Sequence, residues 1–250
     1  MNEQDYIRKI RRELLHWESR LLKPPGMLER AYKPIQTKLN DLMPDKVQYA
    51  LTAAIRTIVK GVVAGAQFLP ARLPELGWTL AERDAEADRV TDTYRKIAAA
   101  EGAGTGAAGL VLGLVDFPAL LAIKMKFLFE LAHVYGFSTR LSAERLFLLQ
   151  IFQLAFSSQA KKPALYQAVK AWDTPLLSRG HDADALKRIN WEQFQREYRD
   201  AIDLRKLLQL VPGIGAVVGA WANYGLLGEL GETGKNAYRL RILSDKLDPN

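Results

Sequence analysis

The chain has 250 residues, of which 48% are hydrophobic and 25% are charged, and this composition excludes an intrinsically disordered protein. It contains no cysteine, which excludes disulfide bridges, thiolate metal sites and a cysteine nucleophile. The formal net charge of +7 attracts polyanions, so the partners to consider are nucleic acid and the acidic cytoplasmic leaflet of a membrane.

The first predicted element is an amphipathic helix that ends at Lys23-Pro24-Pro25-Gly26, because proline cannot continue a helix. Its apolar residues recur at steps of three and four, which is the spacing of one buried helix face: Ile7, Ile10, Leu14, Trp17 and Leu21. Arg8, Arg11 and Arg12 share another face and are the candidate membrane-surface residues. The first residues lack the apolar run of a signal peptide, so we expect a cytoplasmic protein.

Three further helices are predicted between residues 34 and 100: a short one at 34–44, a longer one at 45–68, and a polar one that ends near Ala100. Thr79 and Glu82 form a capping box at the start of the polar helix. This helix also carries carboxylates four residues apart, namely Asp84, Asp88 and Asp92. Metal sites of stacked carboxylates usually include a Glu-x-x-His motif, and no histidine is nearby. We therefore interpret the aspartates as an acidic, solvated face and expect no metal.

The next helix is predicted to restart at Asp116-Phe-Pro118 and to end near Gly136, a residue type that often ends helices. Ser142 is predicted to cap the apolar helix that follows. A charged helix is expected at 182–206. No stretch alternates between apolar and polar residues as a half-buried strand does, so the fold class is all-α.

We expect a single helical-bundle domain that spans residues 1–250, with its core at about 10–245. The best candidate for a variable connection is 161–181, which carries two prolines and a turn-like Ser-Arg-Gly. Two segments, 102–123 and 207–228, are rich in glycine and almost free of charge. These two segments decide how the function is interpreted.

The glycine-rich segments allow three interpretations. Gly104-Thr-Gly106-Ala-Ala-Gly109 matches a dinucleotide-binding pattern, but that pattern needs a preceding strand, so we reject it. Each segment has the length of about 20 residues that a membrane-spanning helix needs, so membrane entry stays an alternative. Glycines four residues apart, such as Gly215 and Gly219, favour close helix packing. We expect the segments to form a tight, buried hairpin in a water-soluble bundle.

A second class of function is suggested by polar residues within the apolar helices. Asp116, Lys124 and His133 share one neighbourhood, and Asn223 comes from the second glycine-rich segment. These side chains could line an apolar pocket for a lipid-like small molecule, or serve a hydrolase. This interpretation is kept as the alternative function.

Other motifs are too incomplete to assign chemistry. Ser158-Gln-Ala-Lys161 lacks the companion motifs of a serine hydrolase, and Gly231-Glu-Thr-Gly234-Lys235 lacks the glycine spacing of a P-loop. The basic first helix contains no known nucleic-acid reader motif. We therefore name no catalytic residues and expect no cofactor and no nucleic-acid partner.

Taken in order, a set of short motifs resembles the EcsC protein family over about residues 10–245. The motifs are Trp17 with Lys23-Pro24, Pro44-Asp-Lys46-Val47, Glu101-Gly102 with Thr105-Gly106, Asp116-Phe-Pro118, Tyr135-Gly136, Glu144-Arg145, and Pro212-Gly-Ile-Gly215 with Gly219 and Asn223. The candidate pocket or family-signature residues are Glu101, Gly102, Thr105, Gly106, Asp116, Pro118, Lys124, His133, Pro212, Gly215, Gly219 and Asn223.

The resemblance implies a bacterial protein linked to an ABC transporter. The founding member of the family is encoded beside an ATPase and a membrane subunit of such a transporter, which is linked to protein secretion, membrane physiology and competence. We accordingly expect a non-catalytic accessory protein at the inner face of the cytoplasmic membrane. Its expected partners are transporter components or membrane lipids, bound through the basic first helix and the glycine-rich helices.

Overall fold

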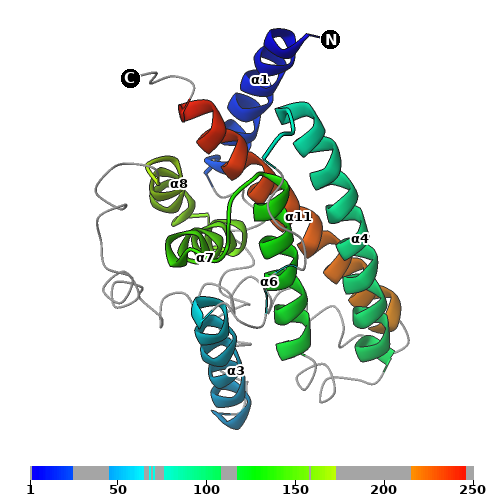
Figure 1. The fold of residues 1–250 in the computed structure, drawn as a ribbon. Coiled ribbons are helices and arrows are strands. Elements are labelled where there is room, and N and C mark those ends of the chain that lie inside the picture. Colours follow the sequence, from blue (N-terminus) through cyan, green and yellow to red (C-terminus); the bar gives the residue numbers. More distant parts are fainter. Residues whose placement is uncertain are drawn as a thin grey trace.

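The computed structural model describes residues 2–24, 45–64, 68, 70, 76–107, 117–157, 159–172 and 215–245. Every regular element in these ranges is a helix, which confirms the predicted all-α class (Figure 1). The helices are α1 (Glu3–Leu21), α3 (Asp45–Ala64), α4 (Leu80–Ala107), α6 (Phe117–Val134), α7 (Ser142–Phe156), α8 (Lys162–Lys170) and α11 (Gly215–Asp245). The helices predicted at 34–44 and 182–206 lie outside the described residues.

The long helix α11 runs through the middle of the bundle, and α4 lies along it (Figure 1). On its other sides α11 also contacts α1, α6, α7 and α8. Helix α11, whose first part falls within the predicted segment 207–228, thus contacts most of the other described helices. Among the described residues, no helix combines the length and the apolar content that a membrane crossing requires.

Local capping explains where α1 and α4 begin. The Asp5 backbone N–H donates to Asn2 Oδ1 at 2.7 Å, which satisfies one free donor of the first turn of α1. The predicted capping box of α4 is confirmed, because Thr79 N–H donates to Glu82 Oε2 at 2.8 Å and Glu82 N–H to Thr79 Oγ1 at 3.3 Å. The hydrogen bond from the Thr79 backbone lowers the pKa of Glu82. From this cap α4 continues to Ala107 instead of ending near Ala100.

The chain reverses between α6 and α7, and the predicted helix end near Gly136 is confirmed. Gly136 has a φ of +88°, a left-handed conformation that favours glycine. The Arg83 guanidinium lies against this glycine and donates to the Tyr135 carbonyl. The predicted cap by Ser142 is wrong. Leu141 takes the extended cap position and no side chain caps the helix, because α7 already begins at Ser142.

The core is centred on α6 and α7, whose buried residues face several directions around each helix, as expected of helices enclosed by others. Aromatic rings join these helices to α11, with Tyr135 stacked on Tyr238 at a centroid distance of 5.2 Å. The stripe of α1 predicted from its spacing is buried at Ile10, Leu14, Trp17 and Leu21. The range 161–181, expected to be a connection, contains α8, whose Tyr166 and Val169 are buried.

Candidate functional site

A groove of about 820 Å³ lies between α1, α4 and α11. Among the described residues, six basic and three acidic side chains line it. The basic ones are Lys9, Arg12, Arg20, Arg95, Lys235 and Arg239, and the acidic ones are Glu13, Asp88 and Glu232. Trp17, His16, Thr91, Asn236 and three glycines of α11 also line it. The groove therefore carries an excess of positive charge.

The glycines of α11 set how closely α4 approaches. A Cβ atom added to Gly231 would lie 2.6 Å from Thr91 Cγ2 of α4, which is too close for two carbon atoms. A Cβ on Gly228 would lie 3.3 Å from the Arg95 guanidinium. Arg95 therefore rests on the bare backbone of Gly228, and the centroid of the Tyr224 ring lies 3.9 Å from its guanidinium carbon. Close packing through glycine thus occurs just beyond, and at the end of, the predicted segment 207–228.

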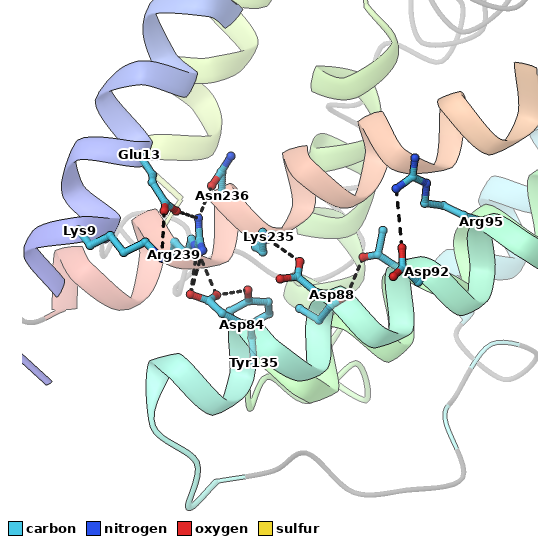
Figure 2. A network of polar contacts seen from close by, with 12 residues as sticks. Lys9, Glu13, Asp84, Asp88, Asp92, Arg95, Tyr135, Lys235, Asn236 and Arg239 are labelled. Carbon is cyan, nitrogen blue, oxygen red and sulfur yellow. Dashed lines mark hydrogen bonds and ion pairs between the residues drawn. The ribbon is translucent and has the colours of Figure 1, made fainter. Parts of the chain in front are cut away.

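Arg239, which lines the groove, forms a buried ion pair with Asp84, and the two residues are 5% and 2% exposed (Figure 2). Arg239 Nε lies 3.1 Å from both carboxylate oxygens of Asp84, and Nη2 lies 3.0 Å from Oδ2. Arg239 Nη1 also donates to Glu13 of α1 at 3.0 Å. One guanidinium therefore connects α1 and α4 to α11.

The Asp84 carboxylate accepts two further hydrogen bonds. The hydroxyl groups of Tyr6 and Tyr135 each donate to it at 2.6 Å. The pKa of Tyr135 is raised well above its ordinary value, and burial is the largest cause. The charge of Asp84 and the hydrogen bond to it also raise this pKa. Burial alone would lower the pKa of Arg239, but the hydrogen bonds and charge of Asp84 outweigh it and raise the pKa. Arg239 therefore stays charged in the core, and the Asp84 carboxylate accepts its hydrogen bonds.

The interpretation of the three aspartates as a solvated face is wrong for Asp84. This carboxylate is buried, whereas Asp88 and Asp92 are exposed. Asp88 pairs with Lys235 at 2.5 Å, and Asp92 lies 3.7 Å from Arg95 (Figure 2). Residues four apart lie on the same side of a helix, so the three aspartates share one side of α4. That side faces the bundle at Asp84 and solvent at Asp88 and Asp92. Within the described ranges, no group of three His, Asp or Glu side chains gathers as a metal site does.

A second buried polar cluster lies on the far side of α11, and the sequence did not indicate it as a site. Glu144 of α7 is 4% exposed and accepts hydrogen bonds from the Tyr238 hydroxyl and from Arg241 Nη1, both at 2.6 Å. Burial, followed by the charge of Glu144, raises the pKa of Tyr238 well above its ordinary value. The cluster fixes α7 to α11. The sequence contained two signals of it: the family motif Glu144-Arg145, and the arginines at 239 and 241 in the last helix.

Three of the residues predicted to line a pocket lie on α6 and α11. Lys124 is buried and its Nζ donates to the Leu120 carbonyl at 3.5 Å, within α6. His133 Nε2 lies 2.9 Å from Thr139 Oγ1, in the turn that follows α6. Asn223 is buried on α11. None of these residues lines the groove.

The remaining signature residues are distributed as follows. Gly102 is buried in α4, while Glu101 in α4 and Pro118 in α6 are half-buried. Asp116 and Pro212 lie outside the described residues. The side-chain surroundings of four others also lie outside them: Thr105, Gly106, Gly215 and Gly219. The predicted pocket therefore stays a prediction.

The three arginines predicted to face a membrane are exposed on α1. Arg8 pairs with Asp5 in the preceding turn and keeps 70% of its side chain exposed. Leu15 follows Arg8 by seven residues, Arg11 by four and Arg12 by three, so it lies on the same helix face. Its exposure is 65%, which is high for a leucine. The outward face of α1 thus carries an apolar side chain among three cations, and the exposure of this leucine was not predicted from the sequence.

Comparisons with known proteins identify a family and two related proteins. The model of the EcsC protein family matches residues 8–243. The chain is 42% identical over 236 residues to Protein EcsC of Bacillus subtilis (strain 168), covering 94% of this chain and 96% of that protein. It is 32% identical over 150 residues to the uncharacterized protein YdbA of the same organism, covering 60% and 54% of the two chains. No solved structure gives a significant match.

Proposed function

Since this chain belongs to the EcsC protein family, we propose that it is a non-catalytic accessory protein at the cytoplasmic face of the membrane. In this proposal α1 docks on anionic lipid and places the bundle beside an ABC-type transporter. The link to the transporter comes from what membership of the family implies. The lipid docking comes from the surface of α1.

The observation that carries the proposal is the position of Leu15 among Arg8, Arg11 and Arg12. Each cation near a membrane surface adds about 1 kcal/mol of attraction to acidic headgroups. An apolar side chain on the same helix face can enter the interface between headgroups and acyl chains. Because the opposite face of α1 is buried against the bundle, this helix can dock without leaving its place.

Flotation of the protein with lipid vesicles tests the proposal. We expect binding to vesicles that contain phosphatidylglycerol, and weaker binding to pure phosphatidylcholine vesicles. The double variant R8Q/R11Q removes two outward cations and should lose about 2 kcal/mol of attraction, a roughly 30-fold weaker affinity. Arg12 is left unchanged in this variant because it also lines the groove.

The matched control is K96Q/K126Q, which removes the same charge from exposed positions on α4 and α6. A general attraction of a basic protein to anionic lipid would weaken equally in both variants. Docking by α1 should weaken only in R8Q/R11Q. Equal binding by the two variants, or absence of binding to anionic vesicles at low salt, would contradict the proposal.

A further inference from the structure

We propose that the groove between α1, α4 and α11 binds a phosphate group through Arg95, Arg12 and Lys235. The ligand class is a phosphate ester, either a soluble one or the headgroup of a phospholipid. This inference concerns the groove, which shares Arg12 with the outward face of α1, and does not depend on docking there.

The basic side chains of the groove differ in whether a carboxylate neutralises them. Arg239 forms ion pairs with Asp84 and Glu13, and Arg20 forms one with Glu232. Arg12 forms no ion pair with any residue that the structure describes, and it is exposed. The pair between Lys235 and Asp88 is partly exposed, and such pairs contribute little. A dianionic group could therefore enter beside Arg12 and Lys235 and be attracted by charge that the protein itself does not neutralise.

Arg95 has the features of a phosphate-binding arginine. Its planar guanidinium is positioned between the Tyr224 ring and the backbone of Gly228. The nearest anion, Asp92 Oδ1, is 3.7 Å away, and Arg95 makes no hydrogen bond with a described residue. Its Nε is buried without a partner, an arrangement that is rare in proteins. The side chain is thus held by stacking and not by acceptors, which leaves its other N–H donors for a bidentate contact with phosphate.

The shape of the groove fits a phosphate that carries a substituent. Gly225 has no side chain to fill it and is exposed, so an oxygen can approach the α11 backbone closely at this residue. The volume of about 820 Å³ lies within the range of small-molecule sites, whereas inorganic phosphate alone would leave most of it empty. The indole of Trp17 offers an apolar surface at the same groove. A phosphate ester with an uncharged portion therefore matches the groove better than a free ion.

Isothermal titration calorimetry on the full chain at low salt tests this site with defined probes. The probes are inorganic phosphate, glycerol 3-phosphate, and short-chain phosphatidylglycerol below its critical micelle concentration. Saturable binding of glycerol 3-phosphate alone identifies a soluble phosphate ester, and stronger binding of the lipid identifies a headgroup. Either result supports the proposal. Absence of saturable binding by all three probes overturns it.

Matched variants assign the binding to the groove. R95Q should weaken it about tenfold, whereas R89Q, an exposed arginine of the same helix that pairs with Glu86, should not. If R95Q disturbs folding, judged by circular dichroism, R12Q provides the same test from an exposed position. Its control is the neighbouring R11Q, which does not line the groove. Equal affinities within both pairs overturn the proposal. R8Q/R11Q should keep the binding of soluble probes even where it loses vesicle flotation, so the two proposals can fail separately.

Discussion

Arg239 and Asp84 are separated by 155 residues in the chain, yet the Arg239 Nε lies 3.1 Å from both oxygens of the Asp84 carboxylate. Both side chains are buried, and the same guanidinium also reaches Glu13 of α1. The pair therefore fixes α4 to α11 and provides a polar attachment for α1. The contribution of this ion pair to the free energy of unfolding can be measured.

Asp84→Ala should lower the free energy of unfolding by about 3–5 kcal/mol, because it leaves the Arg239 cation buried without its carboxylate. The measurement is urea denaturation followed by circular dichroism. Asp92→Ala is the control, since this exposed aspartate of the same helix should change stability by less than about 0.5 kcal/mol. A loss in Asp84→Ala no larger than that of the control would show that the ion pair does not hold these helices together.

Alkaline pH should destabilise the fold through its buried tyrosines. The pKa of Tyr135 and of Tyr238 is raised by burial and by a neighbouring carboxylate, so the fold favours the neutral phenol. The stability that they contribute is fully present below about pH 10, the pKa of an unfolded tyrosine, and is lost as the pH rises above it. We expect these tyrosines to leave the midpoint of thermal unfolding unchanged between about pH 7 and pH 9. Above about pH 10 their ionisation should lower this midpoint.

The variant Y135F/Y238F checks this assignment. It should be less stable at neutral pH, because two buried hydrogen bonds to carboxylates are lost. Its midpoint should nevertheless fall less steeply above about pH 10, since the two groups that titrate are gone. An alkaline decline as steep as that of the unchanged protein would assign the effect to other groups.

Gly231→Ala should destabilise the protein by about 1–3 kcal/mol, although alanine is the better helix former. The added Cβ would collide with Thr91 Cγ2 at 2.6 Å and push α4 away from α11. Gly77→Ala is the control, because no atom lies within 4 Å of the Cβ that it adds. Thr91→Ala should restore part of the loss in the double variant. A stability gain in Gly231→Ala alone would mean that α4 shifts without cost.

Leu15→Ser should reduce the part of vesicle binding that survives high salt. Burial of a leucine side chain contributes about 1.5–3 kcal/mol and, unlike the attraction of arginines, is not screened by ions, so a loss of about tenfold or more is expected. Leu141→Ser is the control, because Leu141 is equally exposed at 65% but lies before α7. Identical flotation of both variants at high salt would show that α1 binds by charge alone.

The features predicted from the sequence are those set by neighbours in the chain. The period of α1 identified Ile10 and Leu14 as buried because residues three or four apart share a helix face. The capping box at Thr79 was also predictable, because Thr79 and Glu82 lie within one helix turn. Ser142 was assigned wrongly because a cap depends on where the helix begins, and a shift of one residue removes it.

The candidate site could not be predicted because it joins segments far apart in the sequence. The burial of Asp84 depends on an arginine near the end of the chain, and the spacing of aspartates on α4 contains no information about that partner. The groove likewise needs α1, α4 and α11 together. The family, by contrast, was recognised correctly, because its motifs are ordered along the whole chain and the match to its model covers residues 8–243.

The position of α11 in the middle of the bundle limits how its sequence can diverge. It contacts five other described helices, so a substitution that suits one neighbour must also suit the others. Its exposed positions are few among the described residues: Trp221, Gly225, Glu232 and Ser244. Even there, Glu232 pairs with Arg20 and Gly225 lines the groove. Random mutagenesis with selection for folded protein would therefore recover few changes along this helix, and related chains should differ least where it passes between its neighbours.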